Sequence, residues 1–456
     1  MRLDHNLCPD DLSPLVKTFL ELARRKILDL ERTWDPKKGT PVFTVRGRYA
    51  TRGWTEWTQG FLYGCQVLYF EATGDRKLLE MARENIYDYM APHVSHIGVH
   101  DHGFNNVSTY GNLRRLMNAG RIKENEDERA FYEMALKVSG AVQAARWTKT
   151  HDGTGFIYSF NGPQSLFCDT IRSLRSLALA HKLGHSLMGE ADERISLLRR
   201  LVEHLDNTLT YNVFYGENRD AYDVPGRVAH ESLFNVTDGR YRCSSTQQGY
   251  SPFSTWTRGL AWILTGTAEQ LEFLSSLKAR EFRGICAPKR LLKRVERAAR
   301  ATADFLIEYT CADGIPMWDT GAPRLAKMGN VYARPSQPRN PHEPVDSSAA
   351  AIAAQGYLRL ADFLRRKDKL ASARYRQAGL LMARTLFSTP YLSEDPKHQG
   401  LILHSIYHRP NGWDYRPRPE LVPFGESSMW GDYHAMELAV MLQQMARGRR
   451  PFRFFD

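Results

Sequence analysis

The chain has 456 residues, a net charge of +11 and 42% hydrophobic residues, enough for a large core in one domain or several. Its 62 lysines and arginines are interleaved with 51 acidic residues and accompany no nucleic-acid-binding motif, so we expect no nucleic-acid partner. Residues 1–34 carry charges throughout and contain no apolar stretch long enough for a signal or a membrane span. These features predict a cytoplasmic protein with no membrane partner, or a periplasmic one if a signal peptide has been removed.

Helical periodicity runs through most of the chain. In the segment 346–366, apolar residues recur at steps of three and four behind a cap at Asp346 or Ser347. Several such segments are separated by only a few residues around a glycine, which is typical of antiparallel helix hairpins. In chain order, we expect helices to begin near Leu12, Trp57, Lys77, Phe104, Glu126, Asp169, Glu190, Ser254, Lys289, Asp346, Leu370 and Trp430.

The hairpins predict an all-α fold. Six of them closing on themselves would form an (α/α)6 barrel, a toroid whose inner helices line a cavity, and stacking into an open solenoid is the alternative. No Gly/Ser linker divides the chain, so we interpret residues 1–456 as one domain with residues 1–40 as an N-terminal helical lead-in. Long connections at 211–252, 318–345 and 403–427 are rich in aromatic residues, His, Arg, Gly and Pro, and we place them at the mouth of the cavity.

Two aspartates stand at the starts of predicted helices among aromatic residues, Asp101 in "HDHGF" and Asp169 in "SLFCDTIRSL". Either could be only an N-cap. Two carboxylates facing one cavity would instead suit proton transfer to and from a sugar, provided that burial keeps one of them protonated near neutral pH. The apolar residues 166–168 would raise the pKa of Asp169, whereas Arg172 would lower this pKa if the two side chains meet.

A second group of candidates lies in "QQGYSPFSTWTRGLAW". If Ser254 caps the helix, Arg258 and Trp262 share one helical face, which offers a guanidinium for a carboxylate beside an indole on which a sugar ring can lie. The alternative is an arginine packed over a core tryptophan. The earlier stretch "WTEWTQGF" repeats the theme with Trp54 and Trp57, although aromatic residues at a helix start are more often core than platform.

The stretch "HVSHIGVHDHGF" contains His93, His96, His100 and His102, a spacing that is feasible for a metal site. No second ligand-rich motif such as HExxH accompanies them, and the six cysteines are scattered without a CxxC pair. We therefore predict no metal and no cofactor. The histidines are interpreted as loop groups around Asp101, and His100 and His102 could tune its charge.

Taken in order, these segments resemble those of the unsaturated glucuronyl hydrolases, glycoside hydrolase family 88. The resemblance covers the chain from about residue 40 to 445. It implies an (α/α)6 barrel and an unusual reaction, in which the enzyme hydrates the C4=C5 double bond that polysaccharide lyases leave on a non-reducing uronic acid. The matching motifs are those around Trp57, Asp101 and Asp169, then "QGYS", "WTRGLAW", "DSSAAAIAA", "LILHSIYHRPNG" and "SSMWGDYHAMELAV".

The resemblance also implies roles for individual residues. Asp169 corresponds to the general acid and base, and Asp101 to a group that assists by holding water or substrate. Arg258 would bind the carboxylate of the uronate. The implied aromatic walls are Trp57, Phe160 and Trp262, and the implied contacts to the unsaturated uronate are His230, Gln248, Arg258 and Tyr407.

Four residues depart from the family pattern. Thr170 stands where the family usually has Asn, Phe160 where it has Trp, Gln247 where it has His, and Leu260 where it has Gln. These changes surround the implied sugar subsite, so the uronate, linkage and sulfation pattern stay open.

The predicted function is therefore a glycosidase that releases the unsaturated uronic acid from lyase-generated acidic oligosaccharides, which are its predicted partners. The alternatives on the same barrel are an unsaturated rhamnogalacturonyl hydrolase and a saturated uronic-acid glycosidase. From another class, a non-catalytic carbohydrate-binding barrel is possible, although the presence of both Asp101 and Asp169 favours an enzyme. The sequence does not indicate an oligomeric state, and a monomer is compatible with it.

Overall fold

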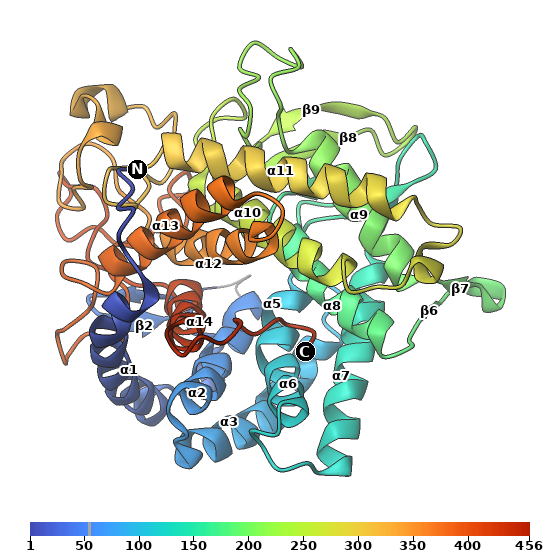
Figure 1. Ribbon diagram of the computed structural model, residues 1–456, viewed down its shortest axis with the longest axis horizontal. Helices are drawn as coiled ribbons and strands as arrows, with labels where there is room; N and C mark the ends of the chain where they lie inside the picture. Colours follow the sequence, from blue (N-terminus) through green and yellow to red (C-terminus); the bar gives the residue numbers. More distant parts are fainter. Residues whose placement is uncertain (53–55) are drawn as a thin grey trace.

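The computed structural model describes residues 1–52 and 56–456. Helices make up most of this part of the chain (Figure 1), and none of its helices is both long enough and apolar enough to span a membrane. The α-helices are α1 Ser13–Thr33, α2 Gln59–Thr73, α3 Arg76–Tyr89, α4 Ala91–Val94, α5 His102–Asn106, α6 Asn112–Asn118, α7 Glu126–Ala145, α8 Thr170–Lys182, α9 Leu197–Tyr211, α10 Thr257–Leu274, α11 Pro288–Glu308, α12 Ser347–Leu364, α13 Lys369–Leu386 and α14 Met429–Ala446.

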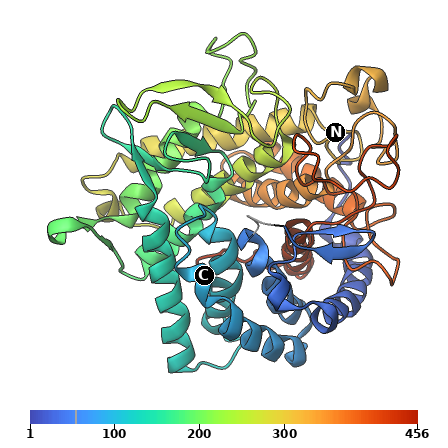
Figure 2. The ribbon, with the colours of Figure 1, turned by 180° about the vertical axis from the view of Figure 1, so that it is seen from behind.

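The helices form two concentric rings. The inner ring runs in order through α2, the α5–α6 pair, α8, α10, α12 and α14, and it closes because α14 packs against α2. Each inner helix is backed by the helix that follows it, and α1 packs against α14 to complete the outer ring. Figures 1 and 2 show this toroid from its two sides. The predicted (α/α)6 barrel is therefore confirmed, and the expected lead-in at residues 1–40 contributes α1 to its outer wall.

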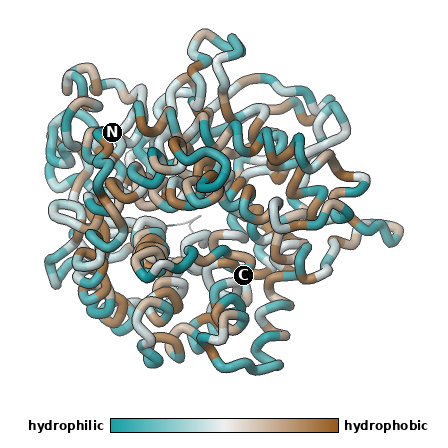
Figure 3. Tube along the Cα trace, in the orientation of Figure 1, coloured by the Kyte–Doolittle hydropathy of each residue, from teal (hydrophilic) through white to brown (hydrophobic). Residues whose placement is uncertain are grey.

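Inner and outer helices differ in how they bury their side chains. The outer helix α11 buries Leu291, Val295 and Ala298 along one face and exposes a basic face, as its periodicity predicts. The inner helix α12 is buried on almost all sides, and its cap is Asp346, whose carboxylate accepts a hydrogen bond from the Ser348 amide. Figure 3 shows the hydrophobic residues as stretches along the helices, whereas the ends of peripheral loops are mostly hydrophilic.

Short antiparallel sheets connect some of the helices. The pairs are β1 with β2, β3 with β4 and β6 with β7, and β8 lies between β5 and β9. The pairing of β5 with β8 sets Phe167 opposite Glu231, which places the residues next to them side by side. The strands are β1 Phe43–Val45, β2 Arg48–Ala50, β3 Trp147–Lys149, β4 Gly155–Ile157, β5 Ser165–Phe167, β6 Leu187–Met188, β7 Arg194–Ile195, β8 Glu231–Phe234 and β9 Tyr241–Ser245.

Two of the predicted helix starts are wrong. The helix expected near Glu190 begins at Leu197, because residues 187–195 form the β6–β7 hairpin that projects from the barrel (Figure 1). The helix expected behind a Ser254 cap begins at Thr257, because Trp256 pairs with Asp319 as an isolated bridge and takes the N-cap position. The predicted aromatic residue Trp54 lies outside the described residues.

A buried ionic network occupies the barrel one turn below Asp169. Arg172 donates to both oxygens of Glu269 at 3.1 and 3.2 Å and to Glu437 at 2.8 Å. Arg175 lies 3.6 Å from Glu269, and all four side chains are at most 2% exposed. Two positive and two negative charges thus balance each other in the interior, as burial requires.

The C-terminal tail closes the end of the barrel where the inner helices finish. Phe452 lies under the guanidinium of Arg115 at 4.0 Å, and its carbonyl accepts a hydrogen bond from Arg359 at 2.9 Å. Lys182, the last residue of α8, donates to the carbonyl of Phe455 at 3.1 Å. The tail crosses the barrel in Figure 1. The opposite end, where the inner helices begin, holds the pocket described next.

Candidate active site

A pocket lies where the inner helices begin. Eight of the nine predicted site residues line it: Trp57, Asp101, Phe160, Asp169, Gln248, Arg258, Trp262 and Tyr407. Five further lining residues were not predicted to be part of the site: Phe104, Gln247, Trp256, His408 and Trp413. Trp256 was detectable as the residue two before Arg258, and His408 and Trp413 lie in the long connection 403–427 that the sequence marks as functional.

The backbone around Asp101 is held by the outer helix α7. Gln143 accepts a hydrogen bond from the amide of His102 at 3.0 Å and donates to the carbonyl of His100 at 2.6 Å, so one side chain brackets the aspartate. The glycine of "HDHGF" has a steric role, because a Cβ at Gly103 would lie 2.5 Å from the Ser173 Cα. The close approach of α5 to α8 brings the two aspartates to the same part of the pocket.

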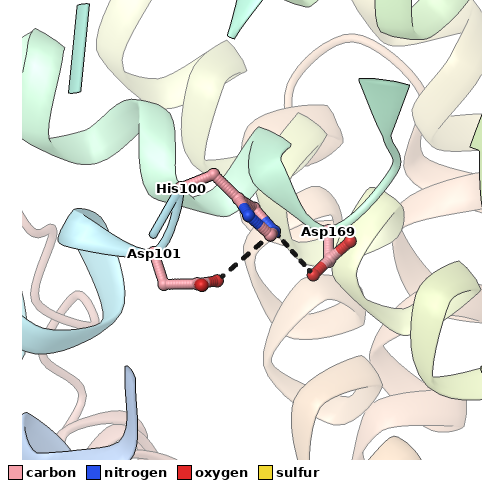
Figure 4. A group of neighbouring side chains, drawn as sticks. All are labelled: His100, Asp101 and Asp169. Carbon is pink, nitrogen blue, oxygen red and sulfur yellow. Dashed lines mark ion pairs between the residues drawn. The ribbon is translucent and has the colours of Figure 1, made fainter. Parts of the chain in front are cut away.

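Asp101 and Asp169 lie on either side of His100 (Figure 4). The Nε2 atom of His100 is 3.7 Å from Asp101 Oδ1 and 3.6 Å from Asp169 Oδ2. The three side chains are buried, with His100 at 0%, Asp101 at 4% and Asp169 at 7% exposure. The two aspartates thus lie in one cavity, as predicted, and the imidazole of His100 lies between them.

Neither carboxylate acts as a helix cap. Asp101 and Asp169 occupy the N-cap positions of α5 and α8, but neither side chain accepts a hydrogen bond from its helix. The Asp346 carboxylate, by contrast, caps α12. The simpler interpretation of Asp101 and Asp169 as capping residues therefore does not hold, and both carboxylates are free to face the pocket.

The two carboxyls differ in their protonation. Burial raises the pKa of Asp101 to about 6, against the opposing effect of His100. Burial acts on Asp169 in the same sense, but the imidazoles of His100 and His230 outweigh it and hold the pKa of Asp169 below its usual range. Arg172 does not contribute as the sequence suggested, because its guanidinium is directed to Glu269 and Glu437.

His230 lies behind Asp169 and does not line the pocket. Its Nδ1 accepts hydrogen bonds from the amides of Gln247 at 3.0 Å and Gln248 at 3.3 Å, so Nε2 carries the proton. That Nε2 faces Asp169 Oδ1 at 3.8 Å. His230 faces the Asp169 carboxylate because the β5–β8 pairing continues to Cys168, whose amide donates a hydrogen bond to the carbonyl of His230. The predicted contact of His230 with the sugar stays a prediction.

Aromatic side chains form the walls. Trp57 stacks on Trp430 with ring centroids 5.1 Å apart, and Trp262 packs on Phe104 at 4.8 Å. Trp262 is only 2% exposed, whereas Phe160 is 39% exposed and offers the most accessible of these ring faces. A sugar entering the pocket would therefore meet Phe160 first.

Arg258 is held by four acceptors. Its guanidinium donates to Asp346 at 2.9 Å, to Gln248 at 3.0 Å, and to the carbonyls of Ile406 and Tyr407. Its cation–π partners are Trp256 at 4.6 Å and Trp430 at 4.9 Å. The arginine therefore fixes Gln248 and the 406–407 segment at the pocket wall.

Known proteins resemble this chain in sequence and in structure. No protein-family model matches the chain. An unsaturated glucuronyl hydrolase of Bacillus sp. strain GL1 is 25% identical over 411 residues, which cover 88% of this chain and 90% of the relative. An unsaturated chondroitin disaccharide hydrolase of Streptococcus agalactiae is 23% identical over 410 residues, covering 88% of this chain and 84% of the relative.

A solved structure agrees over a still larger part of the chain. The crystal structure of an unsaturated glucuronyl hydrolase specific for heparin superposes with a TM-score of 0.71, at 19% identity, over 97% of this chain and all of the other. The chain is therefore similar to unsaturated glucuronyl hydrolases in sequence over most of its length, and it shares their fold. The resemblance of its ordered motifs to glycoside hydrolase family 88 is thereby confirmed.

Departures from the unsaturated glucuronyl hydrolase pattern are concentrated around the carboxylates. Phe160 and Gln247 line the pocket, and the ring of Phe160 lies 5.3 Å from that of His100. Thr170 and Leu260 are fully buried behind the pocket. The residues most exposed to a ligand among these changes are therefore Phe160 and Gln247.

The four histidines do not form one group in this chain. His102 is turned away from the pocket, with Nδ1 at 3.1 Å from Ser139 and Nε2 at 2.8 Å from the carbonyl of His96. His93 and His96 line a separate surface depression. His100, Asp101 and Asp169 are close enough together for three atoms to meet one cation, but the predicted absence of a metal stays a prediction.

Proposed function

We propose that this chain removes the unsaturated uronic acid from the non-reducing end of acidic oligosaccharides made by polysaccharide lyases. The proposal is supported by the family and by one observation above all. Asp101 and Asp169 line the same pocket, and their surroundings push their pKa values in opposite directions. A site that keeps one carboxyl protonated beside one carboxylate can both give and take a proton, here at mildly acidic pH near the Asp101 pKa of about 6.

The proposed reaction adds water across the C4=C5 bond. Asp169 in its protonated form gives its proton to C4, and the ring oxygen stabilises the positive charge that develops at C5. Water then attacks C5 and loses a proton to the Asp169 carboxylate, which forms a hemiketal. The hemiketal collapses to a ketone at C5, the ring opens, and the aglycone leaves from C1. Asp101 supplies the proton with which Asp169 is loaded, and Asp101 also orients the water.

Other lining groups bind the substrate in this proposal. Gln248 takes the uronate carboxylate at the wall through its side-chain N–H groups, because Arg258 holds its Oε1 and so directs the amide nitrogen. Arg258, whose terminal N–H groups are already donated, contributes its positive charge behind Gln248. Phe160, Trp57 and Tyr407 contact the faces of the sugar. The predicted role of His230 as a direct sugar contact is not part of the proposal.

Comparing matched substrates tests the function. Purified protein is incubated with unsaturated disaccharides from chondroitin, hyaluronan, heparin, gellan, ulvan and pectin, and with their saturated counterparts. Hydration of the double bond removes the absorbance of the enol acid, so the expected result is a loss of this absorbance with at least one unsaturated disaccharide and no cleavage of its saturated counterpart.

The alternatives give different results in the same assay. Cleavage of saturated disaccharides would contradict the hydration mechanism. An inverting saturated glycosidase is also disfavoured by geometry, because one atom of each aspartate lies within 4.8 Å of the other, whereas inverting enzymes separate their carboxyls by roughly 6.5–9.5 Å. Binding without turnover across the whole panel would identify a carbohydrate-binding barrel.

A further inference from the structure

His100 is a buried imidazole with no ordinary structural partner. Both of its ring nitrogens lack a hydrogen-bond partner within the described part of the chain. Other buried histidines are tied down: His102 uses both nitrogens, and His204 accepts the Ile157 amide on Nδ1 at 3.0 Å. A fully buried polar group without partners is costly and is most often explained by function.

The ring is nevertheless held in one place. It packs against Phe160 with centroids 5.3 Å apart and edge-on against Phe167 at 5.4 Å. Its backbone carbonyl is fixed by Gln143. The only atom that this packing directs toward both carboxylates is Nε2, at 3.7 Å from Asp101 and 3.6 Å from Asp169 (Figure 4).

Charged and titratable groups surround His100 on several sides. Asp101 and Asp169 raise the pKa of His100 despite its burial. Arg146, from the end of α7, opposes them. His100 in turn lowers the pKa of His204 on α9 and of His230 in the segment before β8. The two carboxylates outweigh burial and Arg146, so the pKa of His100 lies above its usual value.

We propose that His100 is a positioning residue that carries a proton between Asp101 and Asp169. This inference rests on the proposed hydration reaction. The Nε2–H bond of the imidazolium breaks and its proton moves to the Asp169 carboxylate. The O–H bond of Asp101 then breaks and its proton restores the imidazolium. Asp169 can now protonate C4, and after it takes a proton from water the same two transfers run in reverse as the product leaves. No proton is gained or lost by the three groups over one turnover, and one water is added to the substrate.

The arrangement accounts for the different protonation of the two carboxyls. Asp169 has its pKa held below the usual range and must be loaded before it can act as an acid, whereas Asp101, with a pKa of about 6, keeps its proton at mildly acidic pH. The distances of 3.6 and 3.7 Å are slightly too long for hydrogen bonds, so a small rotation of the ring chooses which carboxylate it contacts.

The test compares His100→Gln with wild type on the unsaturated disaccharide that the wild type turns over best. Glutamine keeps a polar group of similar reach but cannot carry the proton. We expect kcat to fall about 10²-fold with little change in KM. The alkaline limb of the kcat profile should at the same time move to higher pH, because His100 lowers the pKa of both carboxyls and its loss raises them; without a relay this easier protonation brings no gain in rate. His102→Gln is the matched control, since His102 lies on the same segment but faces Ser139, and its profile should keep the wild-type limb.

Each other outcome has a definite meaning. A His100→Gln variant that keeps the wild-type kcat would overturn the inference, and so would an alkaline limb that stays in place or moves to lower pH. A stoichiometric metal in the purified protein together with loss of activity on chelation would also overturn it, because a cation would then occupy Nε2. Wild type that turns over none of the unsaturated disaccharides would instead refute the proposed function itself.

Discussion

Two groups of buried charges lie one helical turn apart in this barrel, and they are built in opposite ways. In the lower group, Arg172 makes hydrogen bonds of 2.8–3.2 Å to Glu269 and Glu437. In the upper group, His100 approaches Asp101 and Asp169 no closer than 3.6 Å, and its ring nitrogens have no hydrogen-bond partner among the residues described.

This difference separates charges that hold the fold from charges that act on a ligand. The lower network pairs positive with negative side chains. Removing one member leaves an uncompensated buried charge and lowers the free energy of unfolding. The side chains of the upper group are incompletely paired beside a pocket. This lowers the stability of the fold but leaves these side chains available for chemistry on a ligand. Mutations should therefore affect stability in the lower group and activity in the upper one.

The largest expected effect is on turnover in the upper group. Asp169→Asn removes the proposed acid and base while keeping the shape of the side chain, and we expect kcat to fall by about 10³–10⁴. Enol-acid absorbance measures the rate, and thermal unfolding should show a midpoint close to that of wild type. Near-normal turnover by this variant would contradict the role of Asp169.

The lower group is tested by Glu437→Gln. This change leaves Arg172 with a single carboxylate partner in the interior, and we expect the free energy of unfolding to fall by about 3–5 kcal/mol. Chemical denaturation measures the loss. Glu217→Gln breaks the exposed pair with Arg297 and is the control, with an expected change below about 1 kcal/mol. Equal effects of the two variants would refute a structural role for the network.

Ionisation of Asp101 should determine how kcat/KM declines at alkaline pH. Its pKa of about 6 is raised, so the carboxyl loses its proton as pH rises through this value, and kcat/KM of the free enzyme should decline on that alkaline side. Asp101→Asn should lower kcat by about 10² and remove this decline. Persistence of the decline in the variant would assign it to a different group.

The smallest effects concern the sugar wall. Phe160→Trp restores the residue usual in the family at an exposed ring that touches His100. We expect KM to change severalfold, which is about 1 kcal/mol, with kcat nearly constant. Measurements across the disaccharide panel should show the change to be unequal among substrates. An equal change for all of them would argue against Phe160 as a selectivity residue.

Much of the architecture was predictable because it depends on periodicity and caps. The buried faces and the Asp346 cap are local, and so they are visible in the sequence. The helix start near Glu190 was wrong because hairpin formation at 187–195 depends on cross-strand pairing that no local pattern records.

The sequence could identify site residues by their type and motif, but it could not predict where their side chains point. Asp101 and Asp169 could be found from their motifs, but the position of His100 between them could not, because it depends on packing against Phe160 and Phe167. Likewise, the neighbour of Asp169 is His230 rather than Arg172, since strand pairing and the interior ion network decide where those side chains go. Contacts between distant segments set the electrostatics.

The C-terminal tail limits how an oligosaccharide can enter the pocket. Because the tail and the ionic network close the barrel behind the pocket, a saccharide cannot be threaded through and must enter and leave by the same opening. Under the proposed mechanism only the unsaturated chain end reacts, so each oligosaccharide loses one unit and then carries a saturated end that is not cleaved further. The rate on mixtures of oligosaccharides should therefore follow the molar concentration of ends and not the total mass of sugar.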